Sequence, residues 1–179
     1  TVTDSGLGIQ YADGSSGSTQ VVNLTNLQTG LVVRGATGVS ASQVRGSNLG
    51  LLMDAVSTSG FTLSDANVTD IEVLVLGTDV LDLTLSAITV SSASSGSSTT
   101  SPWAVDVRNE GSFRLQDSNL SGFSGGIRLT GSGSHFLDGV DLDLSGMFID
   151  ASGTGSLPVA DATWVTSRDG LRPLSPPPH

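Results

Sequence analysis

Apolar residues recur along this chain at a fixed spacing of 22 positions, and this period is the strongest constraint on the fold. One column of equivalent positions contains Val22, Val44, Ala66 and Ile88, and the column two residues further on contains Leu24, Gly46, Val68 and Val90. After one step of 30, the two columns resume at Ser118 and Leu120, and after a further step of 22 at Val140 and Leu142. A constant period of this length is typical of solenoid proteins, in which each repeat stacks on the next.

The local pattern within each repeat predicts strands. Apolar and polar residues alternate in segments such as FTLSDANV and FRLQDSNL, as expected of short strands with one buried face. No helical pattern separates these segments, and hairpins would not preserve a 22-residue register from one repeat to the next. The sequence therefore predicts an all-β fold, a right-handed single-stranded parallel β-helix of roughly six or seven coils stacked about 4.8 Å apart.

The single step of 30 predicts an insertion in one coil. Its extra residues fall within the low-complexity stretch SSASSGSSTTSP, residues 91–102, which is typical of a loop. Near the end of the chain, LRPLSPPPH concentrates prolines that fit neither a helix nor a central strand. We expect a β-helix domain over residues 1–160 and a Pro-rich extension or linker over residues 161–179.

The repeat resembles the parallel β-helix family that includes pectate-lyase-like enzymes, tailspikes and many microbial surface proteins. The resemblance covers about Gly6 to Gly155 and is clearest in SFRLQDSNLSGFSGGIRLTGSGSHFLDGVDLDLSG. It implies a fold and leaves the activity open, because the family contains both enzymes and structural proteins. A two-sheet β-sandwich is the alternative for short alternating strands, although sandwiches show no fixed period.

Charge and composition exclude several classes of partner. All 7 basic residues are Arg, against 17 acidic residues, and the net charge of −10 disfavours nucleic acid, whose phosphates bind Lys and Arg. The absence of Cys removes disulfides and thiolate metal sites. The chain contains no stretch of about 20 apolar residues, so the sequence predicts no membrane span. The first ten residues lack the features of a signal peptide.

Three N-glycosylation sequons are the most informative polar feature. They begin at Asn23, Asn67 and Asn119, and the 22-residue register places all three asparagines in one outward column of alternate coils. One interpretation is that these positions carry glycans on a single face of a surface protein. The other is that Asn suits the edge of each coil, with its amide bonding along the stack.

Acidic residues near the end of the repeat form the candidate metal site. Asp138, Asp141 and Asp143 are close in sequence, and Asp141 and Asp143 flank Leu142, so both carboxylates should point outward. They could hold calcium or form a solvated face. We assign no catalytic residue and no other cofactor, because the acidic and basic clusters of the family's hydrolases are absent.

These observations favour a structural or adhesive module of an extracellular or cell-surface assembly, including a glycosylated filament subunit. Its expected partners are other copies of the chain or neighbouring domains of the same assembly. The alternative is a polysaccharide-binding or polysaccharide-degrading β-helix, which would have carbohydrate as its ligand.

Overall fold

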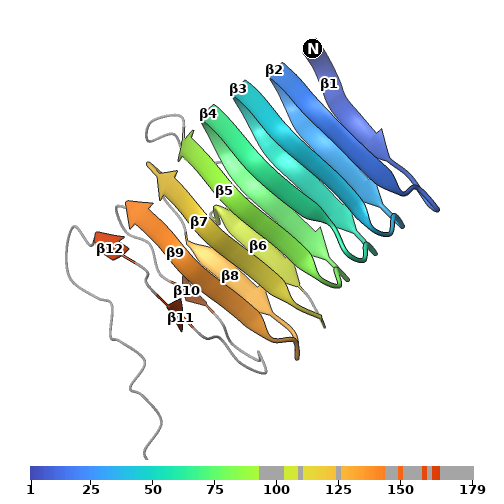
Figure 1. The fold of residues 1–179 in the computed structure, drawn as a ribbon. Coiled ribbons are helices and arrows are strands. Elements are labelled where there is room, and N and C mark those ends of the chain that lie inside the picture. The colour runs from blue at the N-terminus through green and yellow to red at the C-terminus, as the bar shows by residue number, and fades with distance from the viewer. Residues whose placement is uncertain are drawn as a thin grey trace, which may run out of the picture.

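The computed structural model of this protein describes residues 1–92, 103–108, 111–123, 126–143, 149–150, 159–160 and 163–165, with the backbone alone described at 143, 159–160 and 163–165. The elements in these ranges are all strands, and they stack in a continuous array (Figure 1). The strands are β1 (Val2–Tyr11), β2 (Gly17–Arg34), β3 (Val39–Val56), β4 (Thr62–Thr78), β5 (Leu83–Ser92), β6 (Val105–Arg108), β7 (Phe113–Ser121), β8 (Ile127–Thr130), β9 (His135–Asp143), β10 (Ile149–Asp150), β11 (Val159–Ala160) and β12 (Thr163–Val165).

Every strand pairing is parallel and joins one coil to the next. The first part of each coil forms the path β1-β2-β3-β4-β5-β7-β9-β11, while the later part continues from β4 through β6 and β8 to β10. Paired positions in β2, β3 and β4 are 22 residues apart, as in Val22↔Val44 and Val44↔Ala66. The predicted fold is confirmed as a parallel β-solenoid of about six turns, while its right-handed sense stays a prediction.

The pairing offset locates the extra residues of the long coil. Leu63 pairs with Leu85 at an offset of 22, whereas Val75 pairs with Val105 and Leu83 with Phe113 at an offset of 30. The offset therefore changes between Ser92 and Val105, the interval in which the sequence predicts an insertion. Residues 93–102 themselves lie outside the described part of the chain.

The aliphatic columns form the interior of the solenoid. Leu24, Leu63 and Leu85 have no exposed surface, and full burial of such a side chain contributes about 1.5–3 kcal/mol. Ser118 interrupts one column, but its hydroxyl accepts a hydrogen bond from the Ile88 N–H at 3.1 Å and donates one to the carbonyl of Gln116. The polar side chain in this column is therefore buried with its hydrogen bonds made.

A second apolar column contains a glycine, Gly46, and the side chain of a neighbouring residue fills its place. Gly46 lies between Leu24 and Val68 in the register. A methyl group at Gly46 would meet Leu49 Cδ1 at 3.2 Å and the Leu24 carbonyl oxygen at the same distance. Leu49 thus fills the space that a larger residue would take, and the column tolerates Gly because its neighbour covers the gap.

Bends in each coil fall at fixed positions with left-handed backbone. The first bend column contains Val21, Gln43, Asp65, Ala87, Asp117 and Gly139, with φ between 47° and 60°. The second contains Asp4, Asn26, Asn48 and Asp70, with φ of 53° or 54°. Asn, Asp and Gly adopt this conformation readily, whereas a β-branched residue such as Val21 is strained there.

The pairing continues beyond β9 into short strands. β12 pairs with β9 in the same register as the earlier coils, so that Trp164 lies opposite Leu142. Of the Pro-rich extension predicted over residues 161–179, the structure describes only residues 163–165, and the domain boundary at 160 stays a prediction. Among the residues that the structure describes, there is no helix that could span a membrane.

Candidate functional site

The three sequon asparagines lie on one face of the solenoid. The register runs Asn23, Arg45, Asn67, Thr89, Asn119 and Asp141, one residue from each coil. All three asparagines are exposed, whereas the neighbouring positions Val22 and Leu24 are buried. Because adjacent coils are about 4.8 Å apart, Asn23 and Asn67 are separated by about 10 Å. This spacing leaves room for a separate substituent on each asparagine.

The sequon side chains do not hold the stack together. Within the described residues, no hydrogen bond involves the side-chain amide of Asn23, Asn67 or Asn119. Arg45, which lies between two of them, forms an ion pair with Asp65 at 3.0 Å and donates to the Asp65 carbonyl at 2.8 Å. The amides of the sequon column therefore remain accessible on the face of the solenoid.

Amide stacking does occur in this protein, but in the second bend column. Asn48 Nδ2 donates to Asn26 Oδ1 at 2.9 Å, and Asn26 Nδ2 donates to Asp4 Oδ1 at 2.7 Å. This asparagine ladder was missed in the sequence, although the spacing of 22 between Asp4, Asn26 and Asn48 is a visible signal. The amide-bonding explanation offered for Asn in this repeat therefore applies to Asn26 and Asn48.

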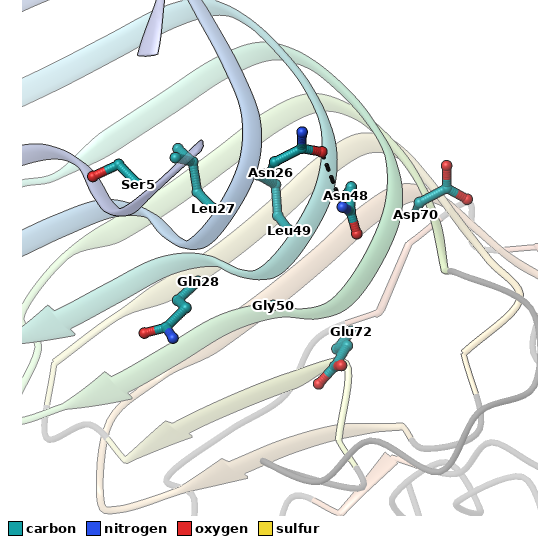
Figure 2. A pocket seen from close by; sticks show the side chains of 9 residues that line it. All are labelled: Ser5, Asn26, Leu27, Gln28, Asn48, Leu49, Gly50, Asp70 and Glu72. Carbon is teal, nitrogen blue, oxygen red and sulfur yellow. Dashed lines mark hydrogen bonds between the residues drawn. The ribbon is translucent and has the colours of Figure 1, made fainter. Parts of the chain in front are cut away.

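A hollow of about 300 Å³ opens beside the asparagine ladder. Figure 2 shows Gln28 and Glu72 on either side of Gly50, with the Asn26–Asn48 hydrogen bond above them. The full lining consists of Ser5, Asn26, Leu27, Gln28, Asn48, Leu49, Gly50, Asp70 and Glu72. Gly50 must stay small, because a methyl group there would approach the Gln28 carbonyl oxygen to 2.9 Å.

The polar side chains at one end of the hollow offer hydrogen-bond acceptors. The side-chain amides of Asn26 and Asn48 each donate a hydrogen bond to the preceding coil. The side-chain oxygen of Asn48 is therefore left at the end of the ladder nearest Asp70. With the carboxylates of Asp70 and Glu72, this end is rich in acceptors. Such an arrangement suits groups that donate hydrogen bonds, including the hydroxyls of a saccharide.

The predicted calcium residues all lie on β9. Asp138 and Asp141 are half-buried on β9, and Leu142 is buried between Asp141 and Asp143 as expected. Asp141 Oδ1 is enclosed and has no hydrogen-bond partner within the described structure, while the side chain of Asp143 lies outside it. No group of three or more His, Cys, Asp or Glu side chains that could hold a metal ion occurs among the described residues. Calcium binding at these positions stays a prediction.

A shielded ion pair lies on the later part of the coils. Arg128 on β8 forms a bidentate ion pair with Asp106 on β6, in which Nε donates to Oδ1 at 2.9 Å and Nη2 donates to Oδ2. The guanidinium also lies 5.1 Å from the ring centre of Trp103. The hydrogen bond to Asp106 raises the pKa of Arg128, and the nearby charge of Asp150 acts in the same direction. Because side chains alternate between the two faces of a strand, Arg128 and Asp106 lie on the outward face, where their ion pair stabilises the pairing of β6 with β8.

His135 lies in the interior of the solenoid. It has no exposed surface, and it pairs with Phe113 of the preceding coil. Burial lowers the pKa of its imidazole. The sequence left the environment of His135 undefined, because a single His at the start of a strand does not reveal which face is buried.

Comparison with known proteins does not identify a relative. No protein family, curated protein or solved structure matches this chain. The resemblance to pectate-lyase-like proteins therefore stays a prediction beyond the level of the parallel β-solenoid.

Proposed function

We propose that this chain is a structural or adhesive module of an extracellular or cell-surface assembly and carries N-linked glycans on one face. The observation that supports the proposal is the alignment of Asn23, Asn67 and Asn119 in one exposed column, free of side-chain hydrogen bonds in the described structure. A glycan is a bulky, solvated group that requires a surface position. The column offers such positions at intervals that keep neighbouring glycans apart.

The open strand edge supports assembly with a neighbouring module. Within the described residues, β1 pairs with β2 on one side and with no strand on the other (Figure 1). Its outer edge presents backbone groups together with Leu7, which is 51% exposed. An exposed edge of this kind is a template for pairing with another chain or coil. The expected partners are therefore other copies of the chain or adjacent domains of the same assembly.

The glycan part of the proposal is tested by intact-mass spectrometry of the protein from its native source. We expect hexose-containing mass that is removed by an N-glycosidase. In a host that glycosylates the wild-type chain, Asn23→Gln, Asn67→Gln and Asn119→Gln should each remove the glycan at that site. Thr25→Ser is the matched control, because it retains the sequon at Asn23. The bare polypeptide mass in native material would refute glycosylation.

The assembly part is tested separately by sedimentation velocity over a range of protein concentrations, with electron microscopy of the same samples. We expect the weight-average mass to rise with concentration and end-to-end filaments to form. Leu7→Lys places a charge on the open edge and should suppress association, as Lys does on natural edge strands. Leu81→Lys, which makes the same substitution at a 45% exposed leucine between β4 and β5, is the charge-matched control. A single monomeric species at all concentrations would refute self-association.

The hollow beside the asparagine ladder favours one alternative, a polysaccharide-binding or polysaccharide-degrading β-helix of the pectate-lyase-like type. Its acceptor groups, Asn48, Asp70 and Glu72, could bind the hydroxyls of a saccharide. Affinity electrophoresis in gels containing neutral or acidic polysaccharides would detect binding, and analysis of the recovered polysaccharide would detect cleavage. Glu72→Gln should weaken retardation, whereas Asp65→Asn, at the other bend column, should not. Equal retardation of both variants would exclude the hollow as the binding site.

A further inference from the structure

His135 is a polar residue in an otherwise apolar interior column. Its register partner is Phe113, which in turn pairs with Leu83, and all three side chains have no exposed surface. Neither ring nitrogen of His135 has a hydrogen-bond partner within the described structure. The imidazole therefore occupies a position that in the two preceding coils belongs to a hydrocarbon side chain.

The other buried polar residues are treated differently by the fold. Thr58 donates its hydroxyl to the carbonyls of Val33 and Val56, at 3.2 and 3.0 Å. Ser118 is hydrogen-bonded to the backbone, and Asp106 is paired with Arg128. His135 alone among the buried polar residues of the described ranges lacks a partner. Its neutral form is tolerated as an aromatic packing group, but its protonated form would be an unpaired buried charge.

No anionic group of the described structure is placed to stabilise a protonated His135. Desolvation by burial is the cause of its lowered pKa, with no contribution from a neighbouring charge. Charged residues of the adjacent strands are exposed, or lie on the outward side, or pair with one another. They are Arg114 and Asp117 on β7, Asp138 and Asp141 on β9, Arg128 on β8 with Asp106 on β6, and Asp150 on β10. The side chain of Asp143, also on β9, lies outside the described structure. β11 and β12 contain no titratable residue.

From this geometry we infer that His135 makes the β9 coil an acid-sensitive part of the solenoid. Protonation of the buried imidazole opens the coil that contains β9, while the N-terminal coils remain stacked. Local opening follows from the architecture, because each coil of a solenoid contacts only its neighbours, and a terminal unit can separate without unfolding the rest. Among the described residues, β9 pairs with β7 on one side and with the short strands β11 and β12 on the other.

The direction of the pH effect follows from proton linkage. A His whose pKa is lowered in the folded state binds fewer protons there than in the open state. The stability of the coil is therefore complete above the ordinary His pKa of 6.5, and it falls as the pH decreases below that value. One proton per opening event shifts the equilibrium by up to about tenfold per pH unit below pH 6.5, or by up to roughly thirtyfold between pH 7.5 and 5.0. Asp and Glu side chains in model peptides titrate near pH 4, below this range.

Hydrogen exchange with residue or peptide resolution tests the inference. Protection factors, corrected for the intrinsic effect of pH, should fall at least tenfold in β9 between pH 7.5 and 5.0, whereas those of β3 should stay constant. His135→Phe replaces the imidazole with the side chain found at position 113, and it should abolish the pH effect in β9. His179→Ala is the control for the second His of the chain and should retain the effect.

Two results would overturn the inference. One is the same loss of β9 protection in His135→Phe, which would assign the pH effect to other groups. The other is an imidazole of His135 that titrates near pH 6.5 with the coil still protected, as measured by NMR in the wild-type protein. The second measurement needs no variant and remains decisive if His135→Phe fails to fold.

Discussion

Removal of Arg128 should destabilise the protein more than removal of any exposed Arg. In the wild-type structure, the side chains of Arg128 and Asp106 are 27% and 11% exposed and meet through two hydrogen bonds. Arg128→Ala leaves the Asp106 carboxylate shielded from water and without its partner. Arg45→Ala is the matched comparison, because it removes the same charge from a pair whose side chains are 47% and 53% exposed.

The expected magnitudes follow from the difference in burial. Loss of one partner from a buried ion pair destabilises proteins by about 3–5 kcal/mol, and the partial exposure of Arg128 places the expected loss near about 3 kcal/mol. The contact with Trp103 contributes about 0.5–1 kcal/mol of this loss. An exposed pair contributes about 0.2–1 kcal/mol, so Arg45→Ala should lower the unfolding free energy by less than about 1 kcal/mol.

Urea unfolding followed by circular dichroism measures both variants. The double variant Asp106→Leu/Arg128→Leu serves as a control. Replacement of both charges by apolar groups should recover most of the stability lost in Arg128→Ala. Equal losses in Arg128→Ala and Arg45→Ala would refute the argument that burial determines the contribution of these pairs.

Three further predictions concern the bends and the close contacts between coils. Val21→Asn should raise the unfolding free energy by about 1 kcal/mol, because Val21 has φ of 56° and is 66% exposed; a lower midpoint in urea would contradict the strain argument. Gly30→Ala should destabilise by about 1–3 kcal/mol, since the new methyl group would lie 2.9 Å from Leu24 Cδ1. Gly6→Ala is its control, with the nearest atom at 3.9 Å, and the two variants should differ clearly in thermal midpoint. Asn48→Gly keeps a residue that adopts the φ of 54° readily, so it should lower stability by about 1 kcal/mol through loss of the ladder hydrogen bond, and an unchanged urea midpoint would show that the ladder contributes nothing.

The site could be predicted from the sequence only where its residues follow the repeat. The common column of Asn23, Asn67 and Asn119 was predicted, because outward positions in a strand are determined by alternation and by the period. The asparagine ladder was missed, although Asn26 and Asn48 have the same spacing. Its residues lie in a bend, where the alternation of a strand no longer indicates the direction of a side chain.

The hollow could not be predicted, because it depends on which side chains are missing as well as on which are present. Gly50 leaves space between Gln28 and Glu72, and the full hollow forms only when the four coils of β1 to β4 are stacked in register. Alternation predicted that Arg128 points outward and pairs with a nearby Asp, but the shielding of its pair with Asp106 and the burial of His135 were not predicted, for a related reason. Burial of a polar side chain is decided by neighbours from other coils, including Trp103 at the end of the insertion.

The sequence by itself determined the architecture of this protein, because a 22-residue period of alternating apolar residues can bury its ladders only by stacking in parallel. It also determined which asparagines share the exposed column and where the offset between coils changes. Only the tertiary structure decided where the chain bends through left-handed backbone and which amides bond from coil to coil. It also decided which charges are shielded and that His135 has no polar partner. The physical reason is that a repeat specifies equivalent positions, whereas hydrogen bonding and burial depend on the particular atoms that neighbouring coils bring together.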